Sequence, residues 1–309
     1  MEMLLRFLAL LLGTFIIIMN LFSAIRTFVL PRAAQDPITK FVFSLIMWAF
    51  KILANAFNTY KQKDKIMAFY APVALLAMPP TWLFLLSIGF AFVYYFLGAS
   101  NLVEAFTISG SSLLTLGFAK SDNLFPILEF LQATIGPLLI ALLISYLPTM
   151  YSAFHTREMS VNRLSVRAGI PPSPVQMLMR FQRLNRLHVL SQFWEEWETW
   201  FARLEESHTS LAALVHFRSP QPDQSWVNAA GTILDAAALR LAIIDLPNDL
   251  EGSRLPDGSE TPSDAQAAIT IRAGFIALRR IADFFQVDYN SSPTYPKVQI
   301  SISRENFNH

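Results

Sequence analysis

Long apolar stretches separated by short polar ones fill the first half of the chain. A helix needs roughly 20 apolar residues to cross a bilayer about 30 Å thick. Three stretches come close to or exceed this length, and each is predicted to be a transmembrane helix: Phe7 to Ala24, Tyr70 to Gly98 and Leu124 to Tyr151. The first is longer than the apolar core of a usual signal peptide, and Arg26 and Arg32 follow it, so we expect a retained anchor.

Prolines and polar positions modify this pattern in two places. Three prolines near the start of the second stretch predict a bend or an irregular beginning there: Pro72, Pro79 and Pro80. A fourth apolar segment, Pro37 to Tyr60, opens with Asp36 as a predicted cap and carries its polar residues on one helical stripe: Lys40, Ser44, Lys51, Asn55 and Asn58. This stripe favours an amphipathic helix lying in the membrane interface, and the alternative is a fourth span.

Composition and charge divide the chain into two parts. Hydrophobic residues make up 53% of the 309 residues and charged residues only 15%, which is more apolar than an ordinary soluble domain. Lys and Arg outnumber Asp and Glu by 12 to 7 through Ile170, whereas the ratio is 12 to 16 after it. We therefore expect a basic membrane part and an acidic soluble part, and the acidic balance argues against nucleic acid as a partner. Because the chain has no cysteine, it forms neither disulfides nor thiolate metal sites.

The positions of the basic residues predict the orientation in the membrane. One basic cluster lies between the first two spans and another just after the third: Arg26, Arg32, Lys40, Lys61, Lys63 and Lys65, then Arg157, Arg163 and Arg167. Both are expected on the cytoplasmic side of a plasma (inner) membrane, and the second could also meet anionic lipid head groups. The segment from Ala99 to Asn123 then lies outside together with Met1, and the C-terminal half lies in the cytoplasm.

The outer segment between the second and third spans has the pattern of a re-entrant loop. Asn101 with Glu104 forms a capping box, and the apolar residues that follow predict a short helix ending just before Thr115. The next residues are TLGFAKSD, with Gly117 among them. Non-helical backbone at membrane depth must face protein or water, so we expect Thr115 to Ala119 to line a water-filled path.

This arrangement resembles the pore module of the potassium-channel superfamily, of the two-transmembrane, pore-loop type. The family's outer helix, pore helix, filter of the form T-V-G-Y/F-G-D and inner helix match 70–98, 101–114, 115–119 and 124–151. The resemblance implies a homotetramer in the lipid bilayer, with no cofactor besides a permeant monovalent cation, K+. It also implies that the filter residues coordinate this cation: Thr115, Leu116, Gly117, Phe118 and Ala119.

The chain departs from that filter at its outer end. Ala119 replaces the family's second glycine, and Lys120 stands where the family has Asp, with Asp122 two residues later. A side chain at a position that favours glycine costs about 1 kcal/mol, and Lys120 brings a positive charge to the pore mouth. We therefore expect a cation channel of uncertain selectivity. The alternative is a non-conducting membrane scaffold or sensor whose cytoplasmic domain binds a partner.

Several residues of the third span are candidates for gating or support of the filter. Gly136 and Pro137 lie about halfway along it and Pro148 near its cytoplasmic end, as expected of a gating hinge, although prolines are also common in membrane helices. Glu129 and Gln132, near its outer end, are expected to support the filter from behind or to line the vestibule. For Glu129, a carboxylate that only reaches interfacial water is the alternative.

The C-terminal half predicts a bundle of helices and no enzyme. Ser173 should cap one helix, and three stripes of apolar residues predict buried faces on the next ones: Phe193, Trp197, Trp200 and Leu204; Trp226, Ile233, Ala237, Leu241 and Ile244; Ile271, Phe275, Leu278 and Phe285. A polar loop separates the last two, and the tail VQISIS predicts a short strand. The glutamates 195–206 with His208 favour a solvated face over a cation site, and no catalytic motif occurs.

The expected organisation is an all-α membrane protein in three parts. Residues 1–66 hold an extra N-terminal transmembrane helix and the interfacial helix, 67–170 the pore-loop channel module, and 171–309 an α-helical cytoplasmic domain whose ligand or regulator is unknown.

Overall fold

The computed structural model describes residues 2–30, 36–120, 126–221, 224–243 and 263–289. Over these residues the protein is all-helical, with no strand. The predicted strand in the tail and most of the predicted polar loop before the last helix lie outside the described residues, as does Ile244.

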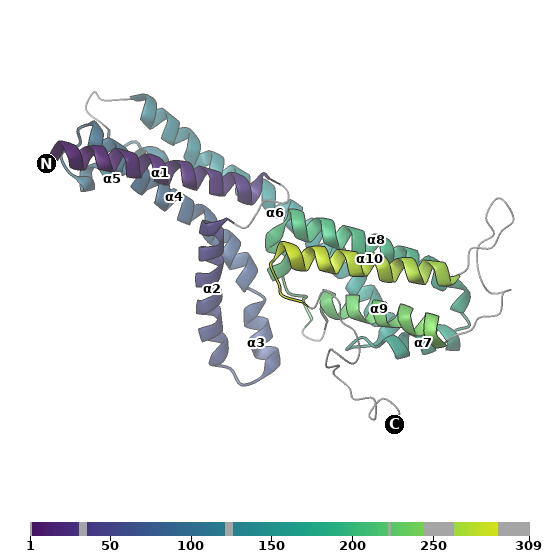
Figure 1. Ribbon diagram of the computed structural model, residues 1–309. Coiled ribbons are helices and arrows are strands. Elements are labelled where there is room, and N and C mark those ends of the chain that lie inside the picture. The colour runs from purple at the N-terminus through teal and green to yellow at the C-terminus, as the bar shows by residue number, and fades with distance from the viewer. Residues whose placement is uncertain (1, 31–35, 121–125, 222–223, 244–262, 290–309) are drawn as a thin grey trace, which may run out of the picture.

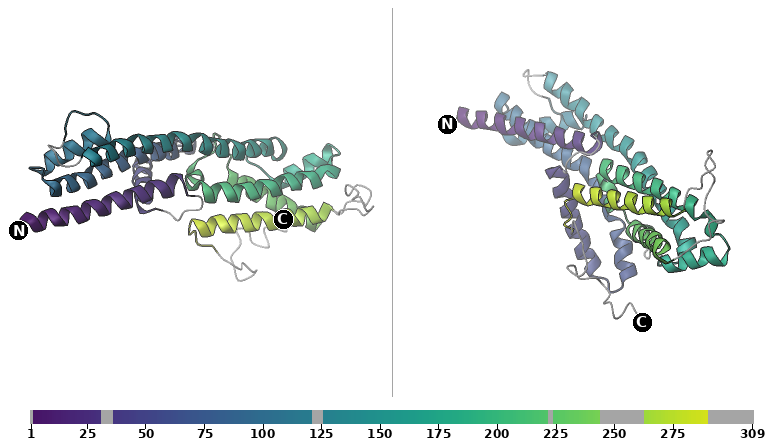
Figure 2. Two further views of the ribbon diagram at one scale, coloured as in Figure 1. Left: turned by 90° about the horizontal axis from the view of Figure 1, so that it is seen from above. Right: turned by 45° about the vertical axis from the view of Figure 1, so that its right-hand side comes forward.

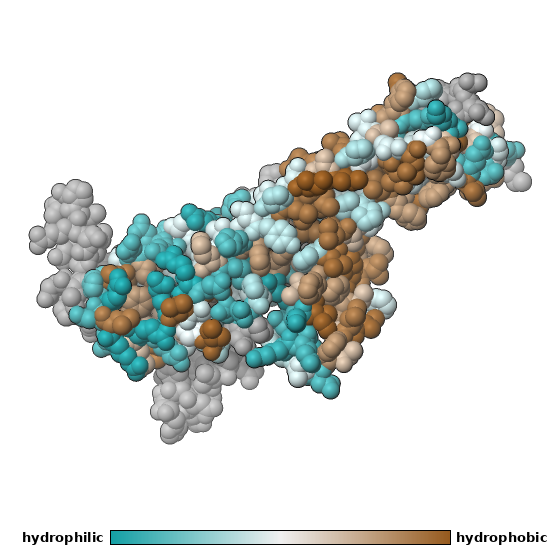
Figure 3. Space-filling model, turned by 180° about the vertical axis from the view of Figure 1, so that it is seen from behind, coloured by the Kyte–Doolittle hydropathy of each residue, from teal (hydrophilic) through white to brown (hydrophobic). Residues whose placement is uncertain are grey.

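The N-terminal part contains the predicted membrane helices. These are α1 (Glu2–Phe28), α2 (Pro37–Asn55), α3 (Tyr60–Met67), α4 (Tyr70–Leu97), α5 (Leu102–Leu113) and α6 (Pro126–Ala168). Four helical stretches in the described residues are long and apolar enough to cross a membrane: α1, α2, α3 continued by α4, and α6. The chain thus has the helices of a multi-pass membrane protein. Hydrophobic residues cover this end of the elongated molecule, whereas hydrophilic residues dominate the other (Figure 3).

One predicted helix end was wrong. The third apolar stretch was expected to end at Tyr151, but α6 continues to Ala168. No glycine or proline occurs between Tyr151 and Gly169, so nothing in the backbone stops the helix where the hydrophobic stretch ends. The consequence is that a single helix runs from the membrane part into the C-terminal part (Figure 2).

Helices α1 and α4 pack closely and antiparallel. Gly13 meets Gly89, where a Cβ on Gly13 would lie 2.5 Å from the Gly89 carbonyl oxygen. Such small residues let two membrane helices approach. The Asn20 side chain donates a hydrogen bond to the Trp82 carbonyl at 2.7 Å. The N-terminus of α1 consequently lies beside α5, at the end of the molecule away from α8 to α10 (Figure 1).

Helix α2 runs across the direction of α1 and α4 and forms a hairpin with α3 (Figure 1). Its predicted cap is confirmed, because the Asp36 carboxylate accepts a hydrogen bond from the Thr39 amide at 3.0 Å. Beside the polar stripe lies an exposed apolar one: Phe41, Leu45, Trp48 and Ile52. A helix with one protein-facing, one apolar and one polar face is typical of a membrane interface. Its position in the interface stays a prediction.

The C-terminal part is built from α7 (Pro174–Arg183), α8 (Leu190–Ser210), α9 (Trp226–Ile243) and α10 (Ser263–Phe284), with the 3-10 turns η1 (Leu187–Val189) and η2 (Ala212–His216). Ser173 caps α7 as predicted, accepting a hydrogen bond from the Gln176 amide at 3.4 Å. The predicted stripe on α8 is confirmed, because its four large residues are all buried.

The predicted faces of α9 and α10 were partly wrong. Ile233 and Ala237 are buried, but Leu241 and Phe275 are exposed. The other large residues of the two stripes, Trp226, Ile271, Leu278 and Phe285, are partly buried against the core, as predicted. Helix α10 also packs through small residues, and a Cβ on Gly274 would lie 2.8 Å from the Phe201 ring. Because small residues carry little hydrophobic signal, the stripe drawn through the large ones left out part of the contact face.

The buried cores cross the predicted domain boundary at residue 170 in both directions. Val161, Leu164 and Ala168, in the last turns of α6, belong to the core of the C-terminal helices. Leu214 and Phe217, from the turn after α8, belong to the core of the membrane part. The two parts are therefore interlocked rather than connected by a simple linker.

Candidate functional site

The structure places the predicted filter residues in a loop directly after the short helix α5. The capping box is confirmed at its start, where the Asn101 side chain accepts a hydrogen bond from the Glu104 amide at 2.9 Å. The Glu104 carboxylate accepts from the Ser100 amide at 2.8 Å, one residue earlier than in the usual box. Helix α5 ends at Leu113, with Leu114 as its C-terminal cap. Its twelve residues span about 18 Å, which is too short to cross a bilayer.

One buried serine holds this loop. The Ser111 carbonyl accepts hydrogen bonds from the Leu116 amide at 2.8 Å and the Gly117 amide at 3.4 Å, and its hydroxyl accepts from the Ala119 amide at 3.0 Å. Thr115 and Gly117 have positive φ angles of 57° and 73°. The left-handed conformation at Gly117 explains the glycine, since a Cβ there would meet no neighbour but would strain the backbone.

The tip of the loop is exposed although it is apolar. Leu116 is 60% exposed and Phe118 70% exposed, and Thr115 and Lys120 are exposed as well. Ala119 is partly buried against the membrane core. Asp122 lies outside the described residues. Exposed apolar side chains on a firmly held loop need a cover, which lipid or further protein chains can supply.

A buried polar cluster connects α4, α5 and α6 behind the loop. The Gln132 side chain donates to the Ser109 hydroxyl at 2.8 Å and accepts a hydrogen bond from the Tyr94 hydroxyl at 2.9 Å. All three residues are buried. The structure thus places Gln132 against α5, and its role in supporting a filter stays a prediction. Glu129 lies half-buried in the first turn of α6.

Gly136 lies very close to the end of α5. A Cβ on Gly136 would lie 2.0 Å from the Leu113 carbonyl oxygen, at the end of α5. The glycine therefore lets the C-terminal end of α5 rest against α6. Pro137 and Pro148 both lie inside the continuous helix, and the use of these residues as a hinge stays a prediction.

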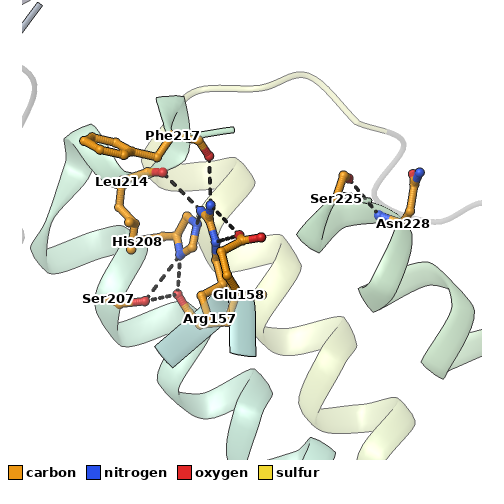
Figure 4. A network of polar contacts seen from close by, with 9 residues as sticks. Arg157, Glu158, Ser207, His208, Leu214, Phe217, Ser225 and Asn228 are labelled. Atoms are coloured by element: carbon orange, nitrogen blue, oxygen red, sulfur yellow. Dashed lines mark hydrogen bonds and ion pairs between the residues drawn. The ribbon is translucent and has the colours of Figure 1, made fainter. Parts of the chain in front are cut away.

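Sequence reasoning missed a buried ionic network at the start of the C-terminal part. Figure 4 shows the Arg157 guanidinium pointing at the carbonyl groups of Leu214 and Phe217, with Glu158 and His208 beside it. It donates to Leu214 at 3.1 Å, to Phe217 at 2.8 Å and to Glu158 Oε1 at 2.8 Å. Arg157 is buried, so it cannot contact lipid head groups as its position in a basic cluster suggested.

The network fixes the tautomer of His208. Arg157 can only donate hydrogen bonds, so His208 Nε2, 3.2 Å away, must be the acceptor. Nδ1 then carries the hydrogen and donates to the Leu204 carbonyl at 2.8 Å. Burial, and secondly the charge of Arg157, lower the pKa of His208 from 6.5 to about 3. The histidine is therefore neutral near pH 7.

The segment between α8 and α9 docks the C-terminal part onto the membrane part. The His216 ring lies 5.3 Å from that of Phe43 and 5.5 Å from that of Tyr70. Arg218 forms an ion pair with Asp64 of α3. The short apolar run LAALVHF in an otherwise acidic half is the signal that sequence reasoning could have used. This docking segment, residues 211–218, is held to α6 by Arg157.

The predicted acidic cluster is used in other contacts. Glu196 pairs with Arg163 at 3.0 Å, Glu205 with Arg280 at 2.9 Å, and Glu198 accepts from Gln266 at 2.7 Å. In the part of the chain that the structure describes, no group of three or more His, Asp or Glu side chains is arranged to hold a metal ion.

Acidification should destabilise the protein through His208. The unfolded chain binds this proton near pH 6.5 and the folded protein only near pH 3, so stability present above pH 6.5 is lost as the pH falls toward 3. Lowering the pH from 7 to 5 should cost about 2 kcal/mol. Thermal unfolding in detergent at pH 7 and pH 5 measures this loss of stability. The loss should be smaller in His208→Gln than in the wild type. His188→Gln, which changes an exposed histidine, should leave it unchanged. An equal loss in His208→Gln and in wild type would contradict this account.

No family model matches the sequence, and neither a curated protein nor a solved structure matches it. The class of the protein therefore follows from its own features alone. Over the described ranges, four long apolar helical stretches, a short helix between two of them and a helical C-terminal part are those of an all-α, multi-pass membrane protein.

Proposed function

We propose that this chain is the subunit of a homotetrameric cation channel, whose ions pass along Thr115 to Ala119. The observation that carries the proposal is the way α5 and its loop are held. Buried polar groups at membrane depth cost several kcal/mol unless they are hydrogen-bonded. Here Ser109, Ser111 and Gln132 are buried, and all three form hydrogen bonds that position α5 or the loop.

The exposed loop tip supports the fourfold assembly. One loop cannot surround an ion, but four identical loops around an axis would cover one another's Leu116 and Phe118 side chains. The loop is held by hydrogen bonds to Ser111, whereas its Leu116 and Phe118 side chains are uncovered. This is what we expect of a loop that other copies of the same chain cover in the assembly. We propose K+ as the permeant ion. Ala119 and Lys120 depart from the filter of potassium channels, so selectivity should be weaker than theirs.

Helix α6 offers a route from the C-terminal part to the proposed pore. It carries Gly136 against the end of α5, with Pro137 next to it in the chain, and Arg157 in the network that holds the docking segment. Pro148, between them, borders a cavity of about 1140 Å³ between α6 and α8. Space beside a proline would allow α6 to bend there, and movement of the cytoplasmic helices would then be transmitted to the filter.

The proposal is tested by ion flux into liposomes containing the purified protein. Thr115→Ala removes the hydroxyl that would face the ion and is expected to change the K+ to Na+ flux ratio. Thr107→Ala is the matched control, because the Thr107 hydroxyl bonds only to the Val103 carbonyl of its own helix turn. The mass in detergent should be four times 34.9 kDa.

Two results would overturn the proposal: identical permeation in wild type and Thr115→Ala, or a monomeric or dimeric mass. A tetramer without any flux would instead favour the non-conducting scaffold, to which the charge of Lys120 at the mouth is better suited.

A further inference from the structure

A second cavity, of about 490 Å³, lies where the membrane helices meet the docking segment. Its walls come from the end of α1, the beginnings of α2 and α4, η2 and the residues after α10. They are mainly apolar: Leu30, Phe43, Met47, Leu75, Val215 and Phe285. The volume lies within the range of about 300–1,000 Å³ that is usual for small-molecule sites.

Two positive charges border this apolar space. Arg26 and Lys40 are exposed and line the cavity, and neither forms an ion pair among the described residues. Asp36 lines it too, but its carboxylate accepts hydrogen bonds from the Ser23 hydroxyl at 2.5 Å and the Thr39 amide at 3.0 Å. Burial lowers the pKa of His216 to about 4, so this histidine adds no charge near pH 7. The two cations are therefore available to a ligand.

We propose that this cavity binds an anionic amphiphile, with its acidic head on Arg26 and Lys40 and its acyl chain along the apolar wall. Charge-assisted hydrogen bonds from arginine and lysine suit a carboxylate or a phosphate. The exposed surface of the wall is mainly apolar, so the protein gains free energy by covering an alkyl chain there. The end of α1 and the start of α2 lie at the predicted cytoplasmic surface of the membrane, where such molecules are supplied.

The position of the site gives the ligand a structural effect. Tyr146 of α6 and His216 of the docking segment both line the cavity. A bound amphiphile thus touches both the long helix and the segment that docks the C-terminal part onto the membrane helices, and it should raise the unfolding temperature of the protein.

Binding can be measured without ion flux, by native mass spectrometry of the full chain in detergent. Palmitate and phosphatidylglycerol are compared with phosphatidylcholine, which has no net charge. The wild type should bind at least one of the anionic amphiphiles about tenfold more tightly than phosphatidylcholine. Tighter binding of palmitate identifies a free fatty acid as the occupant, and tighter binding of phosphatidylglycerol identifies a membrane lipid.

Variants separate this site from general attraction to a basic surface. Arg26→Gln/Lys40→Gln should abolish the preference for the anionic amphiphiles, whereas Lys61→Gln/Lys65→Gln, at exposed positions of α3, removes the same charge and should retain it. Ala213→Phe, which fills part of the cavity, should weaken the binding of palmitate and of phosphatidylglycerol. Three results would overturn the proposal. The wild type could bind phosphatidylcholine as tightly as the anionic amphiphiles, or Lys61→Gln/Lys65→Gln could lose the preference for them as fully as Arg26→Gln/Lys40→Gln. The third is unchanged binding of the anionic amphiphiles by Ala213→Phe. None of these results depends on whether the protein conducts ions.

Discussion

Arg157→Met is expected to lower the free energy of unfolding of the C-terminal part by roughly 3–5 kcal/mol, because it leaves Glu158 buried without its cationic partner. It also leaves the carbonyl groups of Leu214 and Phe217 without their donor. Denaturant unfolding of the purified protein, followed by the fluorescence of the tryptophans in α8, measures the effect.

Two further variants show whether the loss comes from the buried charge. Arg163→Met removes an exposed pair with Glu196 and should cost at most about 1 kcal/mol. In Arg157→Met/Glu158→Leu no buried charge remains, so part of the stability should return. A double variant less stable than Arg157→Met alone would show that Glu158 does not need the guanidinium.

Gly136→Ala is expected to displace α5 from α6, because its Cβ would lie 2.0 Å from the Leu113 carbonyl oxygen. The obstructing atom belongs to the backbone, so no rotamer change relieves the contact. Such overpacking costs about 1–3 kcal/mol. Thermal unfolding in detergent measures the stability, and under the proposed function liposome flux should be lost as well.

The matched control for this variant is Gly110→Ala, on α5 itself. A Cβ on Gly110 would have no neighbour within 4 Å, and alanine favours the helix, so stability should stay equal or rise. If both glycine variants behave alike, the contact between Leu113 and Gly136 does not hold α5 in place.

Local features of the sequence predicted most helix positions. Asp36, Asn101 and Ser173 cap helices as expected, because a capping side chain bonds to an amide only three residues away. The short helix before the loop ends within a residue of its predicted end. The predicted end of α6 was wrong, because hydrophobicity marks where a segment leaves lipid and not where its helix ends.

Part of the candidate site could be predicted because its residues are neighbours in the sequence. The sequence predicted a loop directly after the short helix and a polar residue of the next span near it. The structure shows both and adds the hydrogen bonds that Ser111 and Gln132 form. Gly136 was expected to serve as a hinge, but the structure reveals a packing contact that no pattern within α6 contains. On α10 the prediction missed Gly274, because a glycine carries no hydrophobic signal although it contacts Phe201.

The sequence by itself determined which segments can cross a membrane, where the capped helices α2, α5 and α7 begin, and which short helix lies between two of the long apolar ones, because apolar length and capping act over a few residues. Only the tertiary structure decided that Arg157 is a buried anchor and that residues 211–218 dock on the membrane helices. The donors and acceptors involved lie 57 and 60 residues apart, and a charged side chain is buried only where distant carbonyl groups meet it.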